Sequence, residues 1–313
     1  MTMLSMLAKA AIYQPPRTHS VSGLGDRMLV QKHHINPEQV AQYNEIVEWP
    51  QEQSHLLHPN YIQVMSLPMQ LDLMTSSPFP FKALGLVHIA NRINIVKLPE
   101  LESQLTISCY FGHLYSHKRG AVFEVHTDAS LNGVVAVKAT SYYLAKANKK
   151  TNFTYGDGLS TFSPSVFSDP SHKAVKAQAQ EDSQHTQYAH DLSFSAQCGR
   201  RYAAVSGDYN PIHLWPATSR LFGFKNTIAH GMYSHARCIS ALQANASVQC
   251  QKMSTIKVLF KQAIELPAKT TLHSSSDNHG NTHFTLRKVY PIESHAQSVT
   301  RGKLHLQGSI SRL

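Results

Sequence analysis

The sequence is poor in charged residues, in cysteine and in long apolar runs. Charged residues make up 15% of the 313 residues, and only four are cysteines. Cys109, Cys198, Cys238 and Cys250 are scattered and form no Cys-x-x-Cys pair. This pattern argues against a disulfide framework and predicts a reduced, cytoplasmic protein. No apolar run approaches the ~20 residues that a membrane-spanning helix needs, so we expect no membrane span.

The charge that is present is mainly positive. The formal net charge is +10, and 20 histidines could add to it at mildly acid pH. Such a balance suits an anionic partner, such as nucleic acid, a membrane surface or a phosphate-bearing molecule or carrier, although it can also serve solubility alone. The longest basic run is only Lys149-Lys150 after Lys146, without interleaved aromatic residues. We therefore expect no nucleic-acid partner.

A stretch without apolar periodicity divides the chain. Residues 148–187 are rich in Ser, Pro, Gly, Asp and Gln. A connection of this length is unusual inside one compact domain and typical of a linker. We therefore predict an N-terminal domain over residues 1–147 and a C-terminal domain over residues 188–313, joined by this linker.

The two predicted domains repeat one order of elements. Apolar residues recur at helical spacing in residues 57–74 and again from residue 229 to 244. Each of these segments is followed by several alternating, β-branched runs, which predict antiparallel strands. The first run after each helix leads into Leu-Pro, which ends at Pro99 in the first half and at Pro267 in the second. The expected fold class is α+β, with one long helix and an antiparallel sheet in each half.

One short segment gathers groups that can move protons. Asp208, Asn210 and His213 lie within six residues, with Pro211 fixing the bend between them. Each residue alone is typical of a surface turn, but a carboxylate and an imidazole that converge can exchange protons near neutral pH. Gly231 stands at the predicted start of the second helix, where backbone N–H groups favour a developing negative oxygen. This set suits proton transfer next to a carbonyl and requires neither metal nor cofactor.

The same segment resembles the MaoC-like (R)-specific enoyl-CoA hydratases, also called hydratase 2, which have the hot-dog fold. The matching residues are Ser206-Gly207-Asp208-x-Asn210-Pro211-Ile212-His213, Ser219, Gly223-Phe224 and Ile228-Ala229-His230-Gly231-Met232. The resemblance covers residues 193–313. The two-part layout resembles the double hot-dog members, in which two sheets each wrap a long central helix and only one half keeps the motif.

The resemblance implies a reaction and a role for each residue. Asp208 and His213 would activate a water, Asn210 would orient it, and the amide of Gly231 would bind the thioester oxygen. The reaction would be hydration of a trans-2-enoyl thioester, or the reverse dehydration of an (R)-3-hydroxyacyl thioester. The residues expected to bind substrate are Ser206, Gly207, Ile228, His230 and Met232.

The first half departs from the motif. Glu45 and Glu48 precede its helix, but no imidazole stands at the matching distance from either. The resemblance implies that this half is structural and holds the acyl chain of a thioester on coenzyme A or on acyl carrier protein.

Two other functions remain open at this point. A hot-dog protein can hydrolyse thioesters, and a chain of this kind can be a non-catalytic acyl- or carrier-binding subunit. The complete Asp-Asn-His set argues against the second, because a binder needs no proton-transfer pair. Two fused halves could act as a monomer or pair again as a homodimer.

Overall fold

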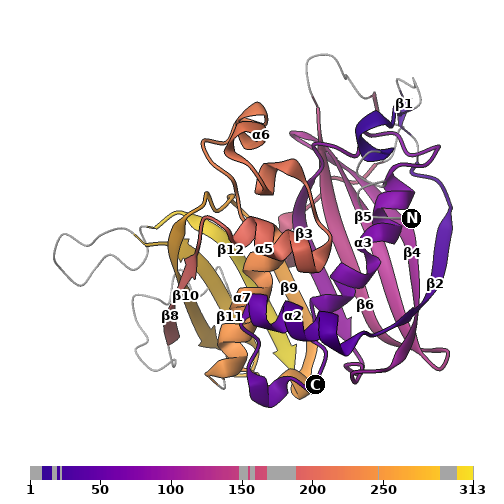
Figure 1. Ribbon diagram of the computed structural model, residues 1–313. Helices are drawn as coiled ribbons and strands as arrows, with labels where there is room; N and C mark the ends of the chain where they lie inside the picture. The colour runs from indigo at the N-terminus through magenta and orange to yellow at the C-terminus, as the bar shows by residue number, and fades with distance from the viewer. Residues whose placement is uncertain are drawn as a thin grey trace. The chain divides into compact units, whose positions relative to one another are not determined.

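The computed structural model describes residues 9–15, 20–21, 23–147, 154–155, 159–167, 188–245, 247–289 and 302–312 (Figure 1). Among these residues, no helix is long and apolar enough to cross a membrane. The three cysteines with described side chains, Cys109, Cys198 and Cys238, are buried free thiols. Most of the predicted linker lies outside the described residues.

The chain forms two compact units. Unit 1 comprises Met1–Ala41, His55–Ser163 and Ala204–Asn210, and unit 2 comprises Gln42–Ser54, Pro164–Ala203 and Pro211–Leu313. Both units therefore take a short segment from the other half of the sequence. The predicted domain boundaries at residues 147 and 188 stay a prediction.

Unit 1 contains one long helix and five strands of an antiparallel sheet. The elements are β2 (Met28–His34), α3 (Tyr61–Met74), β3 (Val87–Ile95), β4 (Gln104–His117), β5 (Gly120–Leu131) and β6 (Val134–Lys146). The strands run in the order β2-β4-β5-β6-β3. Helix α3 lies against β2, β4, β5 and β6, so the sheet wraps it (Figure 1).

Local sequence explains the main features of this sheet. Asn132 and Gly133 both have positive φ, at 49° and 81°, in the two-residue turn between β5 and β6. Asn-Gly is the preferred pair for such a hairpin.

The core beneath β4 and β5 holds an aromatic cluster of four rings, in which contacting rings have centroids 5.2–6.2 Å apart: Phe79, Phe81, Phe111 and Phe123.

Helix α3 buries a polar face in addition to apolar side chains. Gln63, Ser66 and Gln70 are all buried on it. The Gln70 amide donates to Ser66 Oγ at 3.0 Å, and its carbonyl oxygen accepts from Tyr143 on β6 at 2.9 Å. The buried polar groups of α3 are thus paired with each other and with the sheet.

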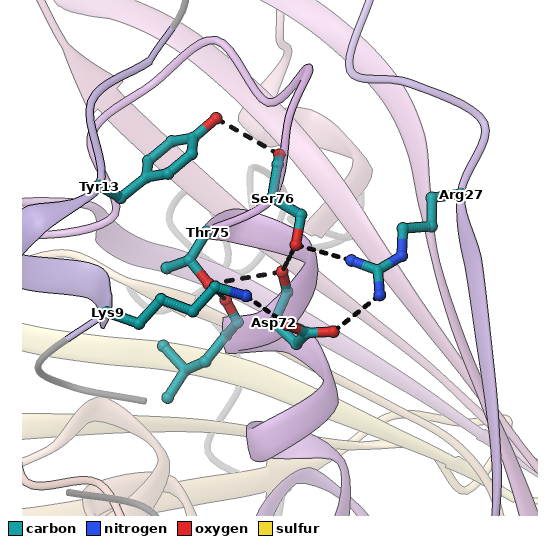
Figure 2. A network of polar contacts seen from close by, with 7 residues as sticks. Lys9, Tyr13, Arg27, Asp72, Thr75 and Ser76 are labelled. Atoms are coloured by element: carbon teal, nitrogen blue, oxygen red, sulfur yellow. Dashed lines mark hydrogen bonds and ion pairs between the residues drawn. The ribbon is translucent and has the colours of Figure 1, made fainter. Parts of the chain in front are cut away.

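The end of α3 is fixed by an ion-pair network (Figure 2). Asp72 accepts from Lys9 Nζ at 2.7 Å and from Arg27 Nη2 at 3.0 Å. Tyr13 donates to the carbonyl oxygen of Phe79 at 2.6 Å. Burial alone raises the pKa of Asp72, but the hydrogen bonds and charges of Lys9 and Arg27 bring that pKa below its usual value. The carboxylate therefore ties two N-terminal segments to the helix.

Unit 2 repeats the arrangement. Its elements are β8 (Tyr188–Phe194), α5 (Cys198–Ser206), α6 (Pro216–Leu221), α7 (Gly231–Ala244), β9 (Met253–Phe260), β10 (Ala268–Ser276), β11 (Thr282–Lys288) and β12 (Leu304–Arg312). The strand order is β8-β10-β11-β12-β9. Helix α7 packs on the sheet through Tyr233 against Phe194 and through His235 against Phe284.

The described chain also contains shorter elements. They are helix α2 (Pro37–Val47), the 3-10 helices η1 (Gln51–Gln53), η2 (Pro164–Phe167), η3 (Pro211–His213) and η4 (Cys250–Lys252), and the parallel pair β1 (Ser20–Val21) and β7 (Thr154–Tyr155).

The two units share one topology. When β2 is matched with β8, β3 with β9 and β4 to β6 with β10 to β12, the strand orders are identical. In both halves of the sequence a short strand and a helix precede the long helix, namely β2 with α2 and β8 with α5. The sequence analysis missed these preceding elements but predicted the long helices and the four strands that follow each of them. The duplication predicted from the weak sequence repeat is present.

Candidate active site

The turn that follows α5 arranges the predicted carboxylate. Gly207 has φ of 74°, a left-handed conformation that glycine adopts without strain. The backbone N–H of Asp208 donates to Ser206 Oγ at 3.2 Å, and Asp208 Oδ1 accepts from the backbone N–H of Asn210 at 3.2 Å. The carboxylate is therefore oriented by its own turn, as is common for Asp before a bend.

Two side chains of unit 1 share the electrostatic surroundings of Asp208. His88 on β3 stacks on Tyr143 of β6, with ring centroids 4.7 Å apart. Burial lowers the pKa of His88 to about 4, although the Ala90 backbone and the charge of Asp208 act to raise it. Burial and the Asp208 charge raise the pKa of Tyr143. Near neutral pH both groups are uncharged, so they place dipoles and no charge around the carboxylate.

His213 belongs to unit 2 and is buried at the end of η3. Its Nδ1 lies 2.8 Å from the carbonyl oxygen of Ile228. Because a carbonyl can only accept, Nδ1 carries the hydrogen and donates. In the neutral ring, the basic lone pair then lies on Nε2. The hydrogen bond thus selects the nitrogen that can take a proton from a reactant.

The ring of His213 also stacks on that of His230, with centroids 3.7 Å apart and planes inclined by 30°. The ligating atoms of these two residues lie within 4.8 Å of each other. The expectation that no metal is needed stays a prediction.

Helix α7 begins at the predicted oxyanion site. His230 is its N-cap, and Gly231 is its first residue. The first N–H groups of a helix have no partner within it and carry the positive end of its dipole. A Cβ on Gly231 would lie 3.2 Å from the Phe260 ring, so glycine allows the helix start to approach β9 closely.

Backbone hydrogen bonds hold the segment before α7 in place. The N–H of Ile228 donates to the carbonyl of Ile212 at 3.3 Å, and that of Ala229 donates to Ile264 at 2.9 Å. Ile228 and Met232, which we predicted to bind substrate, are both buried at this position. The imidazole of His213 and the first amide of α7 are therefore supported by the same short segment.

The predicted site residues are divided between the two units. Ser206, Gly207, Asp208 and Asn210 lie in unit 1, and His213, Ile228, His230, Gly231 and Met232 lie in unit 2. The structure brings together the residues of each group. Asp208 and His213 are five residues apart in the sequence, and the expectation that their side chains act together on one reactant stays a prediction.

Gly199 is a residue that the sequence analysis missed. A Cβ at this position would lie 2.2 Å from the backbone oxygen of His213. Only glycine allows α5 to approach the His213 backbone so closely. A glycine at the start of a helix is unremarkable in sequence, so no local signal could have identified it.

The first half has a turn that corresponds to Gly207-Asp208. Helix α2 ends at Val47, and the next residue, Glu48, has φ of 56°. Trp49 therefore stands where the second half has Asp208, the predicted catalytic carboxylate. Its side chain is buried, and its Nε1 donates to the carbonyl of Gln53 at 3.0 Å. The copy keeps the backbone turn and has lost the carboxylate.

Comparisons with known proteins agree with this fold. Residues 176–285 match the model of the MaoC like domain. The 3-hydroxyacyl-thioester dehydratase X of Mycobacterium tuberculosis (strain ATCC 25618 / H37Rv) is 27% identical over 242 residues, which are 77% of this chain and 78% of that protein.

Two solved structures are similar over nearly the whole chain. The crystal structure of HtdX from Mycobacterium tuberculosis has a TM-score of 0.69 at 23% identity, covering 92% of this chain and all of that one. A MaoC-like dehydratase from Phytophthora capsici has a TM-score of 0.73 at 16% identity, covering 93% of this chain and 96% of that one.

The fold is accordingly the α+β hot-dog fold, present twice, as predicted. The second half of the chain carries a MaoC-like domain. The protein is an enzyme of the dehydratase and hydratase class.

Proposed function

We propose that the protein hydrates trans-2-enoyl thioesters, or dehydrates (R)-3-hydroxyacyl thioesters in the reverse direction. The observation that carries this proposal is the state of His213. Its Nδ1 is committed to the Ile228 carbonyl, and it stands beside the residue that caps α7. A base and a helix-tip amide that are supported by the same short segment suit the formation of an enolate.

In the proposed mechanism, Nε2 of His213 takes a proton from water as the water oxygen adds to the β-carbon. The electron pair of the double bond moves to the thioester, whose oxygen becomes negative at the amide of Gly231. The imidazolium then returns the proton to the α-carbon, so the elements of water add and the thioester bond stays intact. Asp208, five residues before His213, accepts a hydrogen bond from the second hydrogen of the water, which stays on the oxygen as the product hydroxyl, and Asn210 orients the water.

Each part of this mechanism has a known scale. One oxyanion-hole N–H contributes ~10²–10³ in rate, and a positioned acid–base group contributes ~10²–10⁴.

The bound thioester would be carried on coenzyme A or acyl carrier protein. The net positive charge supports either of these anionic carriers. A reduced, cytoplasmic location and a possible homodimer remain predictions from the sequence.

The test follows the enoyl chromophore in the ultraviolet with crotonyl-CoA and a longer enoyl-CoA. We expect wild-type protein to remove the conjugated double bond and the Asp208→Asn and His213→Ala variants to lose about 10² or more in kcat, non-additively. Dehydration of (R)- but not (S)-3-hydroxyacyl-CoA would establish the stereochemistry. Release of free thiol would indicate a thioesterase instead, and binding without turnover of any chain length would indicate a non-catalytic subunit.

A further inference from the structure

A continuous line of side chains in unit 2 leads from His213 to the surface. His213 stacks on His230 at 3.7 Å, and the ring of Tyr202 lies 4.9 Å from that of His230. Tyr202 packs against Tyr233 at 5.2 Å between ring centroids. Arg237 Nη1 then donates to Tyr233 Oη at 3.2 Å. Four contacts therefore join the predicted base to a guanidinium two turns along α7.

Arg237 is an unusual residue for this position. It lies on the central helix with its side chain only 6% exposed. The guanidinium carbon stands 5.7 Å from the Phe194 ring centre and 5.9 Å from that of Tyr233. Removing such a charge from water is costly unless it is paired. A buried arginine inside a hot-dog helix therefore requires a fixed counter-ion.

The counter-ion comes from the first half of the sequence. Arg237 Nη2 lies 2.6 Å from Glu48 Oε2, and Glu48 is 66% exposed. Glu48 is the left-handed residue after α2, at the position that corresponds to Gly207 in the catalytic half. Residues 42–54 belong to unit 2. The turn that lost its own catalytic carboxylate thus supplies a carboxylate to the helix of the other half.

We propose that Arg237, anchored by Glu48, is a positioning residue that acts through Tyr233, Tyr202 and His230 to hold the imidazole of His213. The proposal rests on the proposed function of His213 as the base. The Ile228 carbonyl holds Nδ1 of His213, whereas each aromatic contact on the imidazole ring contributes only about 1 kcal/mol. A charged anchor at the far end fixes Tyr233, and close packing transmits that position to the histidine pair.

The same cavity wall contains a matched control. Arg201 pairs with Glu45 at 3.3 Å, and their side chains are 55% and 75% exposed. Both arginine–glutamate pairs line one cavity of about 460 Å³. Of the two arginines, Arg237 is the one that donates to Tyr233, a member of the series of rings that leads to His213. A general effect of cavity charge would therefore appear in both pairs, and a positioning effect only in the Arg237 pair.

The experiment compares Arg237→Met and Glu48→Gln with Arg201→Met and Glu45→Gln in the full-length protein. We expect kcat with enoyl-CoA to fall about tenfold or more for Arg237→Met, since a misplaced catalytic group loses rate, while KM changes less than about twofold. Glu48→Gln should lower kcat in the same direction by about threefold. The two control variants should stay within about twofold of wild type.

Two further readouts separate positioning from structure. Nitrogen-15 correlation spectra of the imidazoles, with His213 identified by its loss in His213→Gln, should show a single Nδ1–H form in wild type and a mixture in Arg237→Met. In Arg237→Ala, low concentrations of methylguanidinium should restore part of kcat, because the adjoining cavity gives it access.

The outcomes are distinct. Unchanged kcat and an unchanged His213 signal in Arg237→Met would overturn the proposal, as would equal effects in the Arg201 pair. If Arg237→Met does not fold, the largely exposed Glu48→Gln decides the question by the same two readouts. If wild type has no hydratase activity, the proposed function fails. The spectra then still test whether Arg237 holds His213.

Discussion

The immediate partners of His213 set much of its chemistry. One carbonyl, that of Ile228, decides which ring nitrogen carries the hydrogen. One ring, that of His230, covers a face of the imidazole. One glycine, Gly199, allows the backbone of α5 to lie close to the backbone of His213. The Ile228 carbonyl therefore decides which nitrogen of His213 would accept a proton in the proposed mechanism.

The Gly199→Ala variant tests this support at the scale of one residue. The new Cβ would lie 2.2 Å from the backbone oxygen of His213, so that α5 or η3 must shift. We expect kcat to fall about tenfold or more and the free energy of unfolding to fall by about 1–3 kcal/mol. Steady-state kinetics and urea unfolding measure the two effects.

Gly23→Ala is the matched control, because a Cβ at Gly23 meets nothing within 4 Å. Wild-type activity in Gly199→Ala would mean that η3 can move without displacing the imidazole.

The two long helices differ in what they bury. Helix α7 begins with Gly231 and buries eleven consecutive residues from Met232 to Leu242. Helix α3 buries the polar residues Gln63, Ser66 and Gln70, whose amides and hydroxyl are paired with one another and with the sheet. A buried polar network stabilises a fold only while all its members are satisfied. The helix of the first half therefore depends on its hydrogen bonds as well as on apolar packing.

We predict that Gln70→Leu destabilises the protein by about 1–3 kcal/mol, although leucine is the more apolar residue. The change removes the acceptor of the Tyr143 hydroxyl and the amide that donates to Ser66 Oγ. Urea unfolding measures the loss. Tyr143→Phe in the Gln70→Leu background should cost less than Tyr143→Phe alone, because the partner has already gone. Additive losses would show that the two groups do not interact.

For the molecule as a whole, hydrogen-bonded carboxylates make stability depend on acid. Glu124 on β5 accepts from Tyr115 Oη at 2.8 Å and from the His113 N–H at 3.1 Å, and it pairs with His126 at 3.3 Å. Burial alone raises its pKa, but these hydrogen bonds bring the pKa of Glu124 down to about 2. Asp277 also has a lowered pKa, since hydrogen bonds from Asn281, His283 and His279 outweigh the effect of burial.

The sign of this effect is fixed by linkage. The unfolded chain takes up the Glu124 proton near pH 4.5, whereas the folded chain keeps the charge down to about pH 2. Stabilisation is therefore complete above about pH 4.5 and is lost as the pH falls towards 2. A difference of this size corresponds to about 3 kcal/mol.

Glu124→Gln should remove most of that dependence. We expect the variant to be less stable than wild type at pH 7 and to lose less stability between pH 4.5 and 2. Urea midpoints at several pH values measure this, with the exposed Glu38→Gln as control. A variant as acid-sensitive as wild type over that window would show that other carboxylates are responsible.

The sequence by itself determined the order of elements and predicted the position of the proposed chemistry. Periodicity is a local property, so two helices with following strands could be predicted, together with the Gly207 to His213 motif and its loss in the first half. Only the tertiary structure decided which nitrogen of His213 is basic, why residue 199 must be glycine, and that Glu48 serves a helix 189 residues away. These facts depend on side chains and backbones that packing brings together from distant positions, and no local pattern records them.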